Sequence, residues 1–306
     1  VAWKVLNDDS KTGTDAVVTG CSTCEDLQCD GTVGYGGSPD ENGETTLDAM
    51  IFEGDTMNMG AVGGLRKIKH AISTAKYVLQ NTEHSILVGS LATEFSKGMG
   101  FKEESLSTRA SKNMWIKWKE NKCQPNFWFN VHPDSSIVCG PYKPLHYGTR
   151  KTHTNQIKPR VDSMNHDTIS MAVISKNGSI VVGTSSNGAK YKIPGRMGDA
   201  PLPGAGAYAD TTVGAGLATG DGDVMMRFLP SFLMVEMMRN GTSPKDASTE
   251  AIRRITKYYP KFSGAVIAVN KKGKFSAACH GIPEFPFSVA SPSYPEVTVL
   301  RVKCFE

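Results

Sequence analysis

The tripeptide His166-Asp167-Thr168, followed directly by the apolar run 169–174, has the residue types of a peptide bond that cleaves itself. If the bond between Asp167 and Thr168 breaks, Thr168 becomes an N-terminal residue that carries a hydroxyl nucleophile and a free α-amine on neighbouring atoms. A nucleophile and its base would then belong to one residue. Because Asp-Thr also occurs where a turn leads into a strand, the residues that follow must separate the two interpretations.

Polar residues alternate with glycines downstream of Thr168. The segments are Gly183-Thr184-Ser185-Ser186-Asn187-Gly188, Gly195-Arg196-Met197-Gly198-Asp199, Pro203-Gly204-Ala205-Gly206-Ala207-Tyr208-Ala209-Asp210 and Ala218-Thr219-Gly220-Asp221-Gly222-Asp223. Glycines let backbone N–H groups approach a ligand closely. An arginine with an aspartate three positions later offers a fork for a carboxylate and a counter-charge for an ammonium. Arg196 and Asp199 would together hold a free α-amino acid, although the same residues also fit a surface turn with a weak ion pair.

The segment Gly204-Ala205-Gly206-Ala207-Tyr208-Ala209 matches a loose dinucleotide-binding fingerprint. Such a loop must leave a strand and open a helix. Pro201 and Pro203 precede this segment, and no helical pattern follows at once. We therefore predict no nucleotide binding here.

A layered sheet must position these segments. Strands rich in Val, Ile and Ala are predicted at 168–175, 179–184, 263–269, 274–279 and 296–302. Helices are predicted at 65–79, at 107–121 and as a pair between 223 and 259, the second of which starts with Ser243 as N-cap and Pro244 after it. Because several strands are apolar on both faces and flank the helical pair, we predict an α/β arrangement with covered sheets.

Composition places the chain among ordinary globular proteins. Its 306 residues, 39% of them hydrophobic, can bury the core of one large or two medium domains. The net charge of +4 is mild and its Lys and Arg residues are scattered, so nucleic-acid binding has no support. No stretch reaches the roughly 18 to 20 apolar residues that span a membrane. We expect a soluble chain that is processed or truncated before Val1, with an exposed, mobile connector at 143–160.

Seven cysteines favour an oxidising compartment. We predict three short-range disulfides, with Cys21 left over: Cys24 with Cys29, Cys123 with Cys139, and Cys279 with Cys304. The alternatives are a reduced cytosolic protein, or a redox or zinc motif at Cys21 to Cys24. Zinc would need a second ligand pair, and 25–31 has the sequence of an acidic loop rather than the helix start that a redox motif needs. Sequons at Asn177 and Asn240 fit a secretory route.

The motifs around Thr168, in this order and spacing, resemble those of the glycosylasparaginases, or aspartylglucosaminidases, which are N-terminal nucleophile hydrolases. They are His166-Asp167-Thr168, the Ser-Asn-Gly turn, GRMGD, PLPGAGAYAD and ATGDGD. In the N-terminal half, 29–34, 36–41 and 44–50 resemble the family's other strong block, and 126–142 does so more loosely. The resemblance covers nearly the whole chain.

The resemblance implies an αββα four-layer sandwich formed by a single domain, 1–306. Self-cleavage would divide it into an α chain, 1–167, and a β chain, 168–306, and two such αβ units would pair into a heterotetramer. It also implies a lysosomal location, with secretion as the alternative. The implied substrate is a small molecule, a glycosylated asparagine, whose hydrolysis needs no cofactor or metal; no nucleic-acid or membrane partner is implied.

Roles follow position by position from the same resemblance. Thr168 matches the nucleophile, His166 and Asp167 precede the cleaved bond, and Ser186 matches the hydroxyl neighbour that positions Thr168. The expected substrate-binding residues are Arg196 for the α-carboxylate, Asp199 for the α-ammonium, Thr219 and Gly220 for the oxyanion, Gly198 and Gly222 beside them, and Thr32, where the family usually has serine. In the implied mechanism the Thr168 hydroxyl first attacks the Asp167 carbonyl, with the Asp167 carboxylate as proton acceptor.

Three departures from the family pattern stand out. Ser186 replaces a threonine and lacks the methyl group that restrains the rotamer, so cleavage is expected to be slower. Ala247 and Ala268 occupy the positions of a disulfide that is expected in vertebrate relatives. The family's first strand and a substrate-lining tryptophan should precede Val1, since Trp3 resembles a helix position.

Two rival functions share much of this pattern. A plant-type asparaginase or isoaspartyl peptidase would use the same nucleophile, clamp and oxyanion hole, but Asn187 and the cysteine-rich N-terminal half favour glycosylasparagine hydrolysis. A non-catalytic secreted protein could keep the fold and lose turnover, because the implied pocket lacks one wall.

Overall fold

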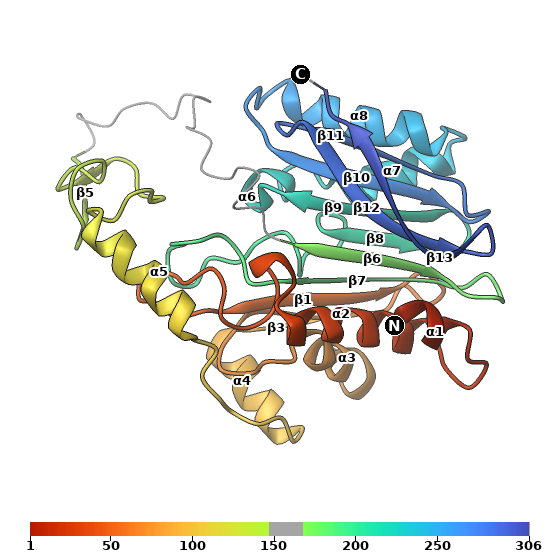
Figure 1. The fold of residues 1–306 in the computed structure, drawn as a ribbon, viewed down its shortest axis with the longest axis horizontal. Coiled ribbons are helices and arrows are strands. Elements are labelled where there is room, and N and C mark those ends of the chain that lie inside the picture. Colours follow the sequence, from red (N-terminus) through yellow and green to blue (C-terminus); the bar gives the residue numbers. More distant parts are fainter. Residues whose placement is uncertain (147–167, 306) are drawn as a thin grey trace.

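The computed structural model describes residues 1–146 and 168–305, which form stacked layers (Figure 1). A five-stranded and a four-stranded sheet face each other in the middle, and helices cover the outer face of each. The predicted αββα sandwich is therefore confirmed.

The elements of this part of the chain are as follows. The helices are α1 (Ala2–Leu6), α2 (Gly13–Leu27), α3 (Ala71–Asn81), α4 (Gly89–Gly98), α5 (Arg109–Glu120), α6 (Gly222–Met225), α7 (Pro230–Arg239) and α8 (Pro244–Thr256). The strands are β1 (Leu47–Glu53), β2 (Met59–Leu65), β3 (Ile86–Val88), β4 (Val131–His132), β5 (Lys143–Pro144), β6 (Ile169–Ile174), β7 (Ile180–Ser186), β8 (Ala207–Asp210), β9 (Gly214–Gly220), β10 (Gly264–Asn270), β11 (Phe275–His280), β12 (Glu284–Ser291) and β13 (Tyr294–Lys303).

The first sheet has the strand order β3-β2-β1-β7-β6. Its central strand, β1, is antiparallel to both neighbours and buried on both faces. Side chains alternate between the faces of a strand. Met50 and Phe52 accordingly pack between the two sheets, whereas Ala49 and Ile51 pack in the core that includes residues of α2 and α3. This double burial explains why β1 has no polar face in the sequence.

The second sheet, β11-β10-β9-β8, is antiparallel throughout. Its outer face is covered by α7 and α8, whose Met234 and Ile252 pack in one core cluster with Val266 of β10. Strand β9 consists mostly of Gly and Ala, which lets α7 approach closely: a Cβ added at Gly216 would stand 2.4 Å from the carbonyl oxygen of Ser231. The small residues of β9 therefore set the spacing between this sheet and its helices.

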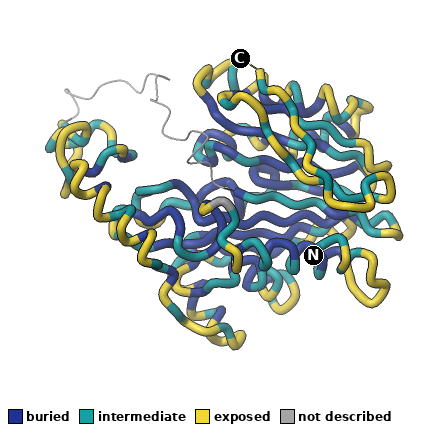
Figure 2. Tube along the Cα trace, viewed as in Figure 1, coloured by how far each residue is buried: buried dark blue, intermediate teal, exposed yellow. Residues whose placement is uncertain are grey.

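Burial follows the layers (Figure 2). The two facing sheets and the inner sides of their helices are buried, while α5 and the β12–β13 hairpin carry many exposed residues. Helix α5 lies away from the sandwich on one side (Figure 1). Trp118 of α5 contacts Tyr191, which belongs to the same loop as Arg196.

Two predictions about helices are wrong. Helix α3 begins at Ala71, not at residue 65, because Leu65 ends strand β2 and Lys67 has a φ of 58°, outside the helical region. Leu65 and Ile68 are buried, but Leu65 lies at the end of a strand and Ile68 in a turn. Their helical spacing in the sequence therefore does not reflect a helix. The predicted acidic loop at 25–31 is also partly wrong, because α2 continues to Leu27 and Glu25 is only 1% exposed.

The remaining expectations about elements are mostly confirmed. Ser243 caps α8 by accepting a hydrogen bond from the Asp246 N–H at 3.2 Å, and Trp3 lies in α1. All five predicted strands and α5 are present within a few residues of their predicted bounds. Segment 204–209 leads into strand β8 rather than a helix, in agreement with the exclusion of a dinucleotide loop. The sequence prediction did not include strands β1 to β5, β8, β9 and β12 or helices α2 and α4. In β12, Pro286 interrupts the strand pattern in an edge hairpin.

The structure forms disulfides between Cys24 and Cys29, between Cys123 and Cys139, and between Cys279 and Cys304. Cys21 is a buried free thiol on α2, and burial raises its pKa. Both sequon asparagines, Asn177 and Asn240, are exposed. Most of the predicted 143–160 connector, together with His166 and Asp167, lies outside the described residues.

Candidate active site

Thr168 lies directly before β6, the edge strand of the first sheet, and is 6% exposed. Strands β6 and β7 pair with Ile169 opposite Ser185, so the next step of this register brings Thr168 opposite Ser186. Within 1–146 and 168–305 the Thr168 hydroxyl is buried and has no hydrogen-bond partner. A buried hydroxyl without a partner costs free energy, so its position is set by the strand rather than by the hydroxyl itself.

Strand β9 of the second sheet ends at the same place. The Thr219 hydroxyl donates a hydrogen bond to the Thr168 carbonyl oxygen at 2.7 Å. Gly220 follows with a φ of 140°, and a Cβ at this position would stand 2.4 Å from the Gly264 Cα on β10. Only glycine allows this approach, which leaves the backbone of Gly220 next to Thr219 at the end of the strand. The site is therefore built where the two facing sheets meet.

Strand β7 ends in a fixed turn beside Thr168. The Ser186 hydroxyl accepts a hydrogen bond from the Gly188 N–H at 2.9 Å. The Asn187 N–H donates to the Thr32 carbonyl at 2.7 Å, and the Asn187 side-chain amide donates to the Gly34 carbonyl at 3.0 Å. This turn brings Thr32, predicted from sequence, to the end of β7 next to Ser186.

Arg196 and Asp199 lie together on the loop between β7 and β8. Asp199 is fully buried, which excludes the alternative of an exposed surface turn. A Cβ added at Gly222 would stand 2.7 Å from Asp199 Oδ1 and 3.3 Å from Arg196 Nη2, so Gly222 lies between the two side chains. The Arg196 guanidinium pairs with Asp223, its Nη2 lying 3.1 Å from Asp223 Oδ2. Gly198 lies beside Arg196 Nη1. The structure therefore brings four predicted site residues close together: Arg196, Gly198, Asp199 and Gly222.

Asp48 holds this loop against the first sheet. It is fully buried at the start of β1; its Oδ1 accepts from the Gly64 N–H at 2.7 Å and its Oδ2 accepts from the Gly198 N–H at 3.1 Å. Sequence reasoning missed Asp48 as a supporting residue, although an acidic residue at the start of an apolar strand was a visible signal. Asp223 was missed too, because its partner Arg196 is distant in sequence.

Two further carboxyl groups lie near these residues, one half-buried and one fully buried. Asp221 caps α6 by accepting from the Val224 N–H at 3.2 Å, and burial raises its pKa, with a further upward contribution from Asp223. Glu25 of α2 accepts from the Ser185 hydroxyl at 2.6 Å and from the Ile72 N–H at 2.9 Å. Burial raises the pKa of Glu25 to about 8, so this side chain is largely protonated at neutral pH.

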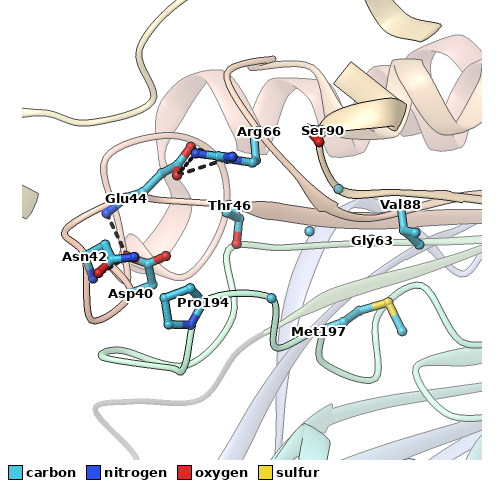
Figure 3. Close-up of a pocket in the computed structure, with 13 residues that line it drawn as sticks. Asp40, Asn42, Glu44, Thr46, Gly63, Arg66, Val88, Ser90, Pro194 and Met197 are labelled. Atoms are coloured by element: carbon cyan, nitrogen blue, oxygen red, sulfur yellow. Dashed lines mark hydrogen bonds and ion pairs between the residues drawn. The ribbon is translucent and has the colours of Figure 1, made fainter. Parts of the chain in front are cut away.

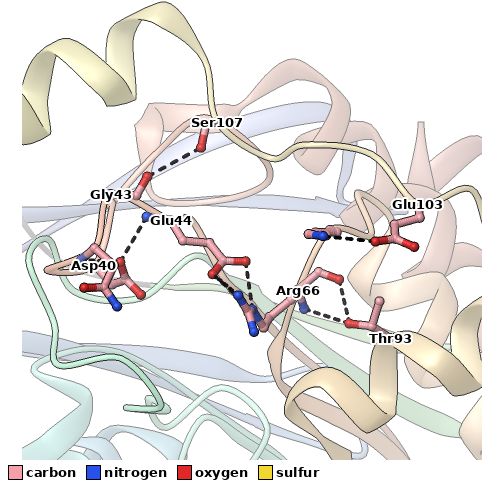
Figure 4. Close-up of polar contacts among 9 residues, drawn as sticks. Asp40, Gly43, Glu44, Arg66, Thr93, Glu103 and Ser107 are labelled. Carbon is pink, nitrogen blue, oxygen red and sulfur yellow. Dashed lines mark hydrogen bonds and ion pairs between the residues drawn. The ribbon is translucent and has the colours of Figure 1, made fainter.

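The far side of the Arg196 loop borders a cavity of about 540 Å³ (Figure 3). Pro194 and Met197 of the loop line it, together with Asp40, Asn42 and Glu44. Figure 4 shows that Glu44 binds Arg66 through two oxygens, with Nη2 2.6 Å from Oε2. Thr168, Asp199 and Thr219 are not among the residues that line this cavity.

Helix α5 and the segment after it brace the same loop. Tyr191 stacks on Trp118 with ring centroids 5.0 Å apart, and its N–H donates to the Pro39 carbonyl at 2.7 Å. Trp128 Nε1 donates to a Glu41 carboxylate oxygen at 2.7 Å. The loop that carries Arg196 is thus held by the 39–46 segment on one side and by aromatic contacts on the other.

Neither a metal-binding cluster nor a membrane-spanning helix is found in the part of the chain that the structure describes. No group of three or more His, Cys, Asp or Glu side chains there could hold a metal ion. No helix among these residues is long and apolar enough to cross a bilayer.

A family model described as asparaginase matches residues 1–299 of this chain. The chain belongs to the asparaginase family. A putative N(4)-(beta-N-acetylglucosaminyl)-L-asparaginase of Drosophila persimilis is 56% identical over 313 residues, covering 99% of this chain and 80% of the relative. The N(4)-(beta-N-acetylglucosaminyl)-L-asparaginases of Mus musculus and Rattus norvegicus are 53% and 52% identical over 305 residues, covering 99% of this chain and 87% of each relative. The resemblance to glycosylasparaginases seen in the motifs is confirmed by these asparaginase-family relatives.

Proposed function

We propose that this asparaginase-family chain is an amidohydrolase that cleaves the bond between N-acetylglucosamine and the side-chain amide of asparagine, after self-cleavage at Asp167-Thr168. One observation carries the proposal: a buried Thr168 hydroxyl without a partner among the described residues lies next to Thr219, at the junction of the two sheets. The names of the fly, mouse and rat relatives support this substrate.

Self-cleavage uses the atoms of the tripeptide. The Thr168 hydroxyl oxygen attacks the Asp167 carbonyl carbon, its proton passes to a neighbouring base, and the C–N bond breaks as the proton reaches the nitrogen. The peptide becomes an ester, which water hydrolyses to give a carboxylate on Asp167 and a free Thr168 with its α-amine. Residues 147–167, which precede the cleaved bond, lie outside the described residues. Of the two residues that share this bond, the structure describes Thr168.

The mature site then uses the same oxygen again. With a reference pKa of about 7.7 to 8.0, the α-amine of Thr168 can accept the hydroxyl proton near neutral pH. The oxygen attacks the side-chain amide carbon of the substrate, the amine of the sugar leaves with a proton, and water hydrolyses the resulting β-aspartyl ester. Aspartate is released. We assign the Ser186 hydroxyl, which accepts from the Gly188 N–H, the role of orienting the nucleophile, because the β6–β7 register brings Ser186 opposite Thr168.

Charge on the substrate oxygen is stabilised at the end of β9. We assign two donors to this oxyanion: the Thr219 hydroxyl, which lies at the Thr168 carbonyl, and the N–H of the next residue in the chain, Gly220. Arg196 binds the α-carboxylate and Asp199 binds the α-ammonium. Gly222 lies next to both side chains and, without a side chain of its own, leaves room for the substrate. A free α-amino acid head is therefore the part of the substrate that this site recognises.

N-terminal sequencing of purified protein, with turnover of glycosylasparagine, tests this proposal. We expect a second N-terminus that reads Thr168-Ile169-Ser170-Met171 and release of aspartate from glycosylasparagine. The Thr168→Ala variant is expected to stay one intact chain. A wild-type protein without the second N-terminus, or one that cleaves β-aspartyl dipeptides much faster than glycosylasparagine, would overturn the proposal in favour of a non-catalytic protein or an isoaspartyl peptidase, respectively.

We also propose that the protein passes through the secretory route to the lysosome and that two αβ units pair. Three disulfides and two exposed sequons support the route. A mass decrease after endoglycosidase treatment tests whether Asn177 or Asn240 carries a glycan. The molar mass of native protein from light scattering tests the pairing, and a single αβ unit would contradict it.

A further inference from the structure

Lys192 is a buried lysine on the loop that carries Arg196. Only 2% of its surface is exposed, and it ranks among the largest fully buried side chains of the described residues. Lysine is rarely buried to this extent unless its ammonium group is paired. The proposed catalytic steps give this side chain no role. A buried loop residue also does not need to carry a positive charge.

The ammonium group of Lys192 ties two segments of the site together. Its Nζ donates to the Asn187 carbonyl oxygen at 2.8 Å and to the Thr46 carbonyl oxygen at 3.4 Å. The backbone carbonyl oxygen of Lys192 accepts a hydrogen bond from the Glu41 N–H at 3.0 Å. The side chain of Lys192 therefore joins the turn beside Ser186 to Thr46, and its backbone adds the contact with Glu41.

The same ammonium group lies beside the Arg196 guanidinium. A Cβ added at Gly188 would stand 2.7 Å from Lys192 Nζ and 3.1 Å from Arg196 Nη1, so both cations approach one point. Two buried positive charges this close repel each other and favour an anion nearby. Asp223 pairs with Arg196 from one side. Asp40 is buried near Lys192: burial raises the pKa of the Asp40 carboxyl group, and the Lys192 ammonium opposes part of that rise.

We propose that Lys192 is a positioning residue of the α-carboxylate clamp: it fixes the Asn187-Gly188 turn against which Arg196 lies and places a second positive charge behind the guanidinium. Lys192 thereby strengthens the preference for substrates that carry a free α-carboxylate. This inference rests on the proposed function in one respect only, that Arg196 binds that carboxylate.

A purely structural lysine would behave differently. If Lys192 only held the turn, its loss would disturb the whole site and weaken every ligand alike. If it contributes to the carboxylate clamp, the loss falls on ligands that carry the α-carboxylate. L-aspartate and β-alanine separate the two cases, because β-alanine is aspartate without its α-carboxylate.

The experiment compares the wild type with Lys192→Met, which keeps the chain length and removes the charge. Lys176→Met, an exposed lysine on the β6–β7 turn that pairs with Asp9, serves as the matched control. Inhibition constants for L-aspartate and β-alanine, kcat and KM on glycosylasparagine, and the melting temperature are measured for each. If Lys192→Met does not yield folded protein, Lys192→Gln takes its place, since it keeps N–H donors and lacks the charge.

We expect the inhibition constant of L-aspartate and the KM to rise about tenfold or more in Lys192→Met, the size expected for one charge several ångströms away at an effective dielectric constant near 20. kcat and the inhibition constant of β-alanine should change less than about threefold. An equal loss for both ligands, or no loss for either, would overturn the inference. If the wild type does not turn over glycosylasparagine, the proposed function fails, while calorimetric binding of aspartate and β-alanine still decides the role of Lys192.

Discussion

Glu25 couples pH to the stability of the layer behind the nucleophile, and its replacement by glutamine tests that coupling. The carboxyl group is 1% exposed and accepts hydrogen bonds from the Ser185 hydroxyl and the Ile72 N–H. Burial raises its pKa from 4.5 to about 8, although both hydrogen bonds lower it. The folded protein therefore keeps a proton on Glu25 at pH values where the unfolded chain has lost it.

The sign and size of the effect follow from this difference. Between pH 4.5 and about pH 8 the folded state binds more protons than the unfolded state, so the free energy of unfolding falls as pH rises. The fall from this one group is at most about 1.4 kcal/mol per pH unit, and on the order of 4 kcal/mol over the window. Below pH 4.5 the group is protonated in both states, and its contribution to stability is fully present.

The Glu25→Gln variant cannot titrate, and its amide oxygen can accept the same two hydrogen bonds. We expect the variant to match the wild type at acidic pH and to be the more stable of the two near pH 8. Urea unfolding at several pH values, with disulfides intact, measures the difference. Glu94→Gln, which replaces an exposed carboxylate paired with Lys97, is the control and should keep the wild-type slope. Equal slopes in the wild type and Glu25→Gln would refute the reasoning.

Three further predictions concern ligand binding and the chemical step. Arg196→Lys loses the bidentate fork, so KM for glycosylasparagine should rise by about 10- to 100-fold with a smaller change in kcat; an unchanged KM would count against the carboxylate clamp. Thr219→Val removes one proposed oxyanion donor, so kcat should fall on the order of a hundredfold, measured by steady-state kinetics on cleaved protein. Gly222→Ala would place a Cβ 2.7 Å from Asp199 Oδ1, so kcat/KM should fall on the order of a hundredfold while the circular dichroism spectrum stays unchanged.

Much of the candidate site could be predicted from the sequence because its residues occur in short motifs. Thr168 stands at a strand start, Arg196 and Asp199 stand three apart, and Thr219 and Gly220 end a glycine-rich strand. Each motif is local, so its residue types indicate its chemistry before its position is known. The supporting residues were not predictable in this way. Asp48 and Lys192 form hydrogen bonds with backbone groups far away in sequence. The residues next to them in the chain do not indicate which backbone groups these are.

Boundaries of elements also needed the tertiary structure. The apolar residues 65–79 have helical spacing, but the first of them belong to a strand and a turn, since a position buried by the opposite layer looks the same in sequence as one buried by a helix face. Strand β1 has no alternation to reveal it, because both of its faces are covered.

The sequence by itself determined the residue types of the chemistry and the layered fold class. Nucleophile, clamp and oxyanion residues are encoded in motifs, and apolar strands beside helices indicate covered sheets. The tertiary structure decided which groups meet: it brings the ends of β6, β7 and β9 to one place and sets Lys192 beside Arg196 across Gly188. The physical reason is that chemical identity belongs to single residues, whereas distance, burial and the resulting electrostatic coupling depend on how separate strands pack.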